Sequence, residues 1–162
     1  MNWSKLYSMQ KELDYRIKEQ HDLHNQNVLH DKMLALLVEL GELANETRCF
    51  KFWSNKGPNE QNIILEEYVD GLHFILSIGI EKGFYYEPSM EFNTPNLSVT
   101  NVFLQVYEKA IQLQNNMSEK NYKTLVEQYL QLGYSLGFNE NMIEDAYVEK
   151  NEVNHERQNK GY

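Results

Sequence analysis

The sequence predicts an all-α protein, a compact bundle of about six helices. Apolar residues recur at three- and four-residue steps over most of the chain, whereas no alternating run is long enough to indicate a strand. The three prolines, Pro58, Pro88 and Pro95, fall between these helical patterns. With 162 residues, of which 41% are hydrophobic and 24% charged, the chain fits one folded domain over residues 1–162.

The first three expected helices cover residues 4–20, 31–50 and 63–82. Asp31 is a suitable N-cap for the second, and Gly83 is a suitable C-terminal stop for the third. The second and third helices are apolar around nearly their whole circumference, which predicts burial. We therefore expect them to form a central antiparallel pair.

Three further helices are expected towards the C-terminus, over residues 99–114, from Ser118 and from about Glu140. Ser118 can cap the helix that it precedes because its hydroxyl can accept from a backbone N–H in the first turn. Residues 150–162 are so polar that we expect a mobile tail at the end of the last helix.

Composition excludes several classes of function. The net charge is −9, with 24 acidic and 15 basic side chains, so general attraction to nucleic acid or anionic lipid is not expected. No stretch approaches the roughly 18 apolar residues of a membrane span, and the N-terminal residues do not resemble a signal peptide. Cys49 is the only cysteine, which suits a reducing compartment. We expect a cytoplasmic protein.

Acidic side chains stand out in the two most apolar helices. Glu39, Glu42 and Glu46 recur at three- and four-residue steps, so they share one side of the second helix. Glu67 and Asp70 repeat the three-residue step on the third. The 24 residues between Glu42 and Glu67 allow an antiparallel return that brings the two groups face to face.

Carboxylates gathered between two apolar helices repel one another unless cations compensate their charge. Mg²⁺ prefers oxygen ligands, and neither histidine nor cysteine clusters with these acids in the sequence. The pattern therefore indicates a magnesium site. The alternative, left open at this point, is that the acids lie on solvated helix faces and pair with lysines.

The segment E39-L-G-E42, followed after 24 residues by E67-Y-V-D70, resembles the E-x-x-E and E-x-x-D signature of the all-α nucleoside triphosphate pyrophosphatases. Two further segments are similar to the dimeric dUTPase branch of that superfamily: RCFKFWS at residues 48–54 and AYVEKNEVNHERQNKGY at residues 146–162. The resemblance extends from the first helix to the last residue and is weakest between residues 83 and 118.

The resemblance implies an all-α homodimer that hydrolyses dUTP, and also dUDP, to dUMP with release of pyrophosphate or phosphate, which limits uracil incorporation into DNA. Two or three Mg²⁺ ions are implied, with Mn²⁺ as a substitute. The implied metal ligands are Glu39, Glu42, Glu67 and Asp70. The implied phosphate-binding residues are Lys150, Asn154, Arg157 and Tyr162. The implied base and deoxyribose contacts are Gln10, Asp14, Trp53, His73 and Phe74.

The resemblance leaves the general base open. Some relatives carry an additional acid directly before the first motif glutamate, whereas this chain has Val38 there. Glu39 is therefore our first choice as general base, and Glu46 is the alternative. The roles of the cations also stay open, since Lys150 and Arg157 lie at helical spacing from neighbouring glutamates with which they could pair.

Other functions remain open at this point. The metal motif does not read the base, so a related pyrophosphatase acting on dCTP or a non-standard nucleotide fits the same acids. A catalytically silent helical dimer that serves as a binding partner is an alternative of another class. Trp53, His73 and Phe74 could equally be ordinary core residues.

Overall fold

The computed structural model describes residues 1–88 and 97–161. Over these residues the chain forms six helices and no strand, as the sequence predicts. Their bounds are α1 (Trp3–Gln20), α2 (Leu29–Thr47), α3 (Gln61–Lys82), α4 (Val99–Asn115), α5 (Glu119–Ser135) and α6 (Glu140–Asn159). None of the described helices is long and apolar enough to cross a membrane.

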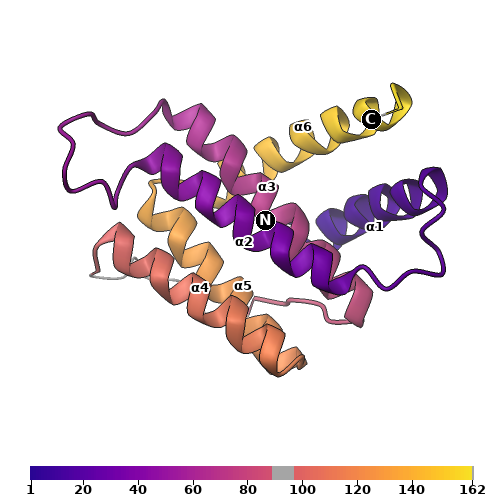
Figure 1. Cartoon of the computed structure of the whole chain (residues 1–162). Coiled ribbons are helices and arrows are strands. Elements are labelled where there is room, and N and C mark those ends of the chain that lie inside the picture. Colours follow the sequence, from indigo (N-terminus) through magenta and orange to yellow (C-terminus); the bar gives the residue numbers. More distant parts are fainter. Residues whose placement is uncertain (89–96, 162) are drawn as a thin grey trace.

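Helix α3 lies at the centre of the bundle and is antiparallel to α2 (Figure 1). The α2–α3 pair is flanked by α4 and α5 on one side and by α1 and α6 on the other (Figure 1). This arrangement follows from the sequence, because α3 buries residues on every side and needs neighbours all round. The expected central pair is therefore confirmed.

Helix α2 ends three residues earlier than its apolar pattern predicts. Arg48 adopts a left-handed conformation with φ of 56°, and its backbone N–H donates to the carbonyl of Ala44. Glycine is the usual residue at a left-handed helix C-terminus, so the sequence did not predict that α2 would end at Arg48. At the other end α2 begins at Leu29, and Asp31 lies in the first turn instead of capping the helix. A negative charge in the first turn interacts favourably with the helix dipole and stabilises the helix.

Helix α3 is fixed to α5 by two stacked tyrosines. The rings of Tyr68 and Tyr129 lie 4.6 Å apart at 19°. The hydroxyl of Tyr68 donates to the carbonyl of Tyr129 at 3.0 Å, and the hydroxyl of Tyr129 donates to the carbonyl of Tyr68 at 2.6 Å. Gly71 and Gly133 leave the space that these hydroxyls occupy. The pair fixes α3 at the residue between Glu67 and Val69, inside the acidic motif.

Helix α6 continues through Asn159 and therefore includes most of the segment expected to be a mobile tail. Lys150 and Gln158 are buried within it, and α6 packs on both α1 and α3. Several polar side chains of this segment contact polar groups outside α6, as Lys150 does with Glu66 of α3 and Gln158 with His21 after α1, while the mobility of the segment stays a prediction. Tyr162 lies outside the described residues.

Candidate metal and nucleotide site

Helices α2 and α3 bring three of the predicted metal ligands together. Glu39, Glu67 and Asp70 each offer one carboxylate oxygen, and these oxygens lie within 4.8 Å of one another. Glu42, one turn further along α2, is exposed and lies outside this triad. Its charge still acts on the triad, because it raises the pKa of both Glu39 and Glu67.

The triad is electrostatically unfavourable without a cation. Burial, followed by the charges of Asp70, Glu42 and Glu67, raises the pKa of Glu39 from 4.5 to about 7. Burial and the neighbouring carboxylates likewise raise the pKa of Glu67, and burial raises the pKa of Asp70. Oxygen donors held this close, with the cation of Lys150 in contact with Asp70, fit a hard divalent cation such as Mg²⁺.

Lys150 lies beside the triad. Its ammonium nitrogen is 2.7 Å from a carboxylate oxygen of Asp70 and 2.7 Å from one of Glu66. The side chain is buried, and these two acids raise its pKa against the effect of burial. Lys150 therefore pairs with acids of α3, and not with the glutamates of its own helix that the sequence offered as an alternative.

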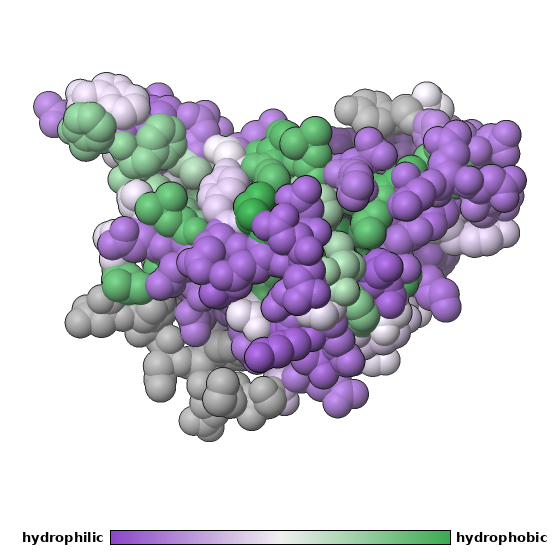
Figure 2. Space-filling view, turned by 60° about the horizontal axis from the view of Figure 1, so that its bottom comes forward, coloured by the Kyte–Doolittle hydropathy of each residue, from purple (hydrophilic) through white to green (hydrophobic). Residues whose placement is uncertain are grey.

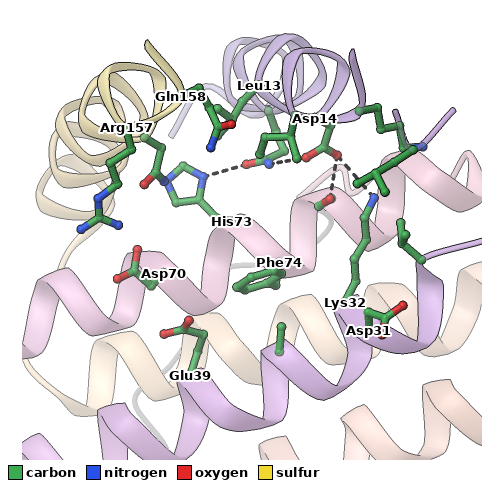
Figure 3. A pocket seen from close by; sticks show the side chains of 18 residues that line it. Leu13, Asp14, Asp31, Lys32, Glu39, Asp70, His73, Phe74, Arg157 and Gln158 are labelled. Carbon is green, nitrogen blue, oxygen red and sulfur yellow. Dashed lines mark hydrogen bonds and ion pairs between the residues drawn. The ribbon is translucent and has the colours of Figure 1, made fainter. Parts of the chain in front are cut away.

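A cavity of about 560 Å³ extends from the triad between α1, α2, α3 and α6. Glu39, Asp70 and Arg157 lie towards one end and Asp14 and Lys32 towards the other (Figure 3). From Asp70 to Ser77, α3 advances about 10 Å at 1.5 Å per residue. The cavity therefore extends about 10 Å along α3 from its acidic end, and its volume lies in the range of small-molecule binding sites.

Most of the predicted nucleotide-binding residues meet in this cavity. Those that line it are Gln10, Asp14, His73, Phe74, Asn154 and Arg157. Trp53 is not among them: it lies in the loop between α2 and α3, 64% exposed, against Phe50 and Phe52. Glu46, the alternative base, is one turn beyond Glu42 and accepts a hydrogen bond from the Asn59 amide at 2.6 Å.

Sequence reasoning missed several residues of the cavity, among them Lys32 and Ser77. Lys32 contacts Glu81 at 2.9 Å and lies 3.8 Å from Asp14. Ser77 donates its hydroxyl to Asp14 at 2.6 Å. Helical spacing could have identified both residues. Lys32 precedes Glu39 by seven residues and Ser77 follows Asp70 by seven, which is two turns in each case and places each pair on one side of its helix.

The triad predicts an unusual pH dependence of stability. The pKa of Glu39 is raised in the folded protein, so the contribution of Glu39 to the stability of the metal-free protein is complete below about pH 4.5 and is lost as pH rises through about 7. We expect this decline in stability to be smaller in the Glu39→Gln variant, which loses the contribution of Glu39 but keeps Glu67 and Asp70 with their raised pKa values. Urea unfolding of both proteins in EDTA at about pH 5 and about pH 8 measures the difference. Parallel losses in the two proteins would contradict the prediction, and Mg²⁺ should restore wild-type stability at the higher pH.

Comparison with known proteins identifies the family. A family model described as dUTPase matches residues 2–162, essentially the whole chain. No curated protein gives a significant match. The match agrees with the six described helices and with an acidic triad of which two members, Glu39 and Asp70, line the cavity. The chain therefore belongs to the all-α dUTPase family of dUTP diphosphatases.

Proposed function

We propose that this enzyme hydrolyses dUTP to dUMP and pyrophosphate, and dUDP to dUMP and phosphate, with Mg²⁺ as its metal ion. The observation that carries the proposal is the position of Glu39 and Asp70, two members of the carboxylate triad, at one end of the cavity, where the phosphates of a bound nucleotide would meet them. Dimeric assembly and cytoplasmic location, where the reaction would limit uracil incorporation into DNA, belong to the same proposal.

Each group of residues has a separate task in this reaction. Glu39, Glu67 and Asp70, with Glu42 nearby, would hold the ions. Bound Mg²⁺ would supply positive charge to the phosphates and activate the attacking water. The same result is expected with Mn²⁺, which shares the preference for oxygen ligands.

The cations of α6 would neutralise phosphate charge beyond the reach of the metal ions. Lys150 is held at the triad by Asp70 and Glu66, and Arg157 lines the cavity near its acidic end. Glu39 is the preferred general base because it lies in the cavity wall, whereas Glu46 is hydrogen-bonded to Asn59 in the following loop.

The test is pyrophosphate release from dUTP, dCTP, dTTP and UTP, each with Mg²⁺ and with EDTA. Selective turnover of dUTP that EDTA stops supports the proposal. Preference for dCTP would retain the metal site and refute the assignment of the base. If no nucleotide turns over, the proposed activity is wrong, and a binding-partner role is favoured instead.

We propose homodimerisation through α2 and α4, where large apolar side chains remain exposed. Leu34 is 63% exposed and Leu104 62%, and Val38 and Ile111 lie one and two turns further along their helices. Tyr107, between the two α4 residues, donates to the carbonyl of Leu37, so these faces adjoin. Figure 2, which brings the lower side of Figure 1 with α4 forward, shows hydrophobic side chains among hydrophilic ones on this side. A second copy would cover such a patch.

The proposed dimer predicts that Leu104→Asp yields a monomer, because a buried carboxylate at an interface has no partner there. Light scattering coupled to gel filtration measures the mass. The matched control is Tyr15→Asp, which introduces the same charge at a residue 60% exposed on α1 and should leave the dimer intact. A Leu104→Asp dimer, or a monomeric wild type, would refute this interface.

A further inference from the structure

A chain of hydrogen bonds runs along one wall of the cavity (Figure 3). Asp14 accepts from the Ser77 hydroxyl at 2.6 Å and from the Gln10 amide nitrogen at 2.8 Å. The Gln10 carbonyl oxygen lies 2.7 Å from Nδ1 of His73 and accepts from the Tyr147 hydroxyl at 2.6 Å. Gln10, His73 and Tyr147 are all buried.

The chemistry of Asp14 fixes the direction of this chain. A carboxylate only accepts hydrogen bonds, so the Gln10 atom that faces it must be the amide nitrogen. The Gln10 oxygen therefore faces His73 and Tyr147, and both must donate to it. Nδ1 of His73 consequently carries the proton. A flipped Gln10 amide would place its oxygen against the carboxylate of Asp14.

The His73 side chain is neutral near pH 7. Its side chain is only 6% exposed, and burial, together with the charge of Lys150, lowers its pKa to about 3. The Tyr147 ring stacks on it at 4.1 Å and 23°, which fixes the plane of the imidazole. With a single proton on Nδ1, Nε2 has a free lone pair.

Nε2 of His73 is a buried acceptor with no hydrogen-bond partner among the described residues. An unpaired buried polar atom destabilises the folded protein, so such atoms usually have a hydrogen-bond partner. His73 lines the cavity one turn along α3 from Asp70, and it is thus placed next to the metal site, where the sugar or base of a nucleotide would lie. A ligand group that donates a hydrogen bond could be the partner that Nε2 lacks among the described residues.

We propose that Asp14, Gln10 and Tyr147 lock His73 in the Nδ1-protonated tautomer, so that Nε2 is a fixed acceptor for a hydrogen-bond donor of the bound nucleotide. Tyr147 and Asp14 are positioning residues, which act through His73. The inference rests on the proposed function only for the identity of the ligand. Two donors of a deoxyuridine nucleotide fit this chemistry: the N3–H of uracil, which cytosine lacks, and the 3′-hydroxyl of the sugar.

The tautomer is tested without substrate, by ¹⁵N NMR of the full chain labelled at histidine. We expect one imidazole with a protonated Nδ1 and an unprotonated Nε2 near neutral pH, and loss of its signals in His73→Gln assigns them. In Asp14→Asn, where the amide of Gln10 is free to flip, the signals should shift towards a mixture of tautomers. A proton on Nε2 in the wild type would overturn the inference even if dUTP is hydrolysed. If the Nδ1-protonated tautomer is found but dUTP is not hydrolysed, the proposed function is wrong, while the inference that Asp14, Gln10 and Tyr147 fix the tautomer of His73 stands.

Kinetics then identifies the donor. His73→Gln and Tyr147→Phe are compared with wild type for kcat/KM on dUTP, dCTP and 2′,3′-dideoxy-UTP. If N3–H is the donor, His73→Gln lowers the dUTP preference over dCTP at least about tenfold. If the 3′-hydroxyl is the donor, the preference over the dideoxy analogue falls instead.

Tyr147→Phe removes one of the two hydrogen-bond donors to the Gln10 oxygen. Whichever kcat/KM ratio falls in His73→Gln, dUTP over dCTP or dUTP over the dideoxy analogue, should also fall in Tyr147→Phe, by a smaller factor. The control is Tyr122→Phe, because Tyr122 is equally buried and loses a hydroxyl bonded to Tyr7 at 2.8 Å, outside the cavity. It should leave both ratios unchanged. Equal losses on all three nucleotides in His73→Gln would overturn the proposal.

Discussion

Replacing Glu39 by glutamine will reduce kcat for dUTP by about a thousandfold or more, since removing one ligand of a catalytic metal costs several kcal/mol in the transition state. Glutamine has nearly the same shape but lacks the charge that would hold a cation between α2 and α3. Glu39 makes its strongest interactions with Asp70, Glu42 and Glu67, and all of these are repulsive. Losing the charge therefore relieves repulsion, and the variant should fold normally.

Steady-state kinetics across a Mg²⁺ titration, with thermal melting in EDTA, measures both effects. Glu119→Gln is the control, because it makes the same chemical change at an exposed acid of α5 that forms an ion pair with Lys123. It should leave kcat unchanged. Glu42→Gln should weaken Mg²⁺ binding less than Glu39→Gln does, because Glu42 lies outside the triad. Full Mg²⁺-dependent activity in Glu39→Gln would rule out the triad as the metal site.

The helices and the acidic pairs could be predicted because both depend on local spacing. A three-residue step on a helix fixes the neighbours of Glu67 and Asp70 whatever the rest of the chain does. Helical spacing says nothing about Trp53, because a loop residue follows no helical period; the resemblance alone proposes it as a base contact, and it lies exposed beyond the end of α2. Helix ends were less certain for the same reason, as Arg48 shows.

The hydrogen-bond chain could not be predicted, because it joins residues far apart in sequence. Gln10 and Tyr147 are 137 residues apart, and they meet only because α1 and α6 both pack on α3. The resemblance placed Gln10 and His73 in the nucleotide pocket, but their partners depend on packing angles that no spacing encodes. Lys150 illustrates the same limit, since its partners Glu66 and Asp70 belong to another helix.

Replacing Gly71 by alanine will destabilise the fold by about 3 kcal/mol or more, because a Cβ there would lie 2.2 Å from the hydroxyl oxygen of Tyr129. The tyrosine cannot move without breaking its hydrogen bond to the Tyr68 carbonyl and its stacking on the Tyr68 ring. At about 2–4 °C per kcal/mol for a chain of this size, melting should fall by roughly 6 °C or more. Gly57→Ala, where nothing lies within 4 Å, should melt within about 1–2 °C of wild type.

The double variant Gly71→Ala with Tyr129→Phe separates steric conflict from a change in helix propensity. If the hydroxyl is the obstacle, its removal makes room for the methyl group, so the double variant should be more stable than the sum of the single losses predicts. Alanine favours a helix over glycine by about 1 kcal/mol, but this gain is present with and without the Tyr129 hydroxyl, so it cancels from the comparison and leaves the steric term. Gly71 also follows Asp70 directly, so a displaced α3 should weaken Mg²⁺ binding in the single variant and recover it in the double. Additive losses would mean that Tyr129 does not hold α3 in place through this contact.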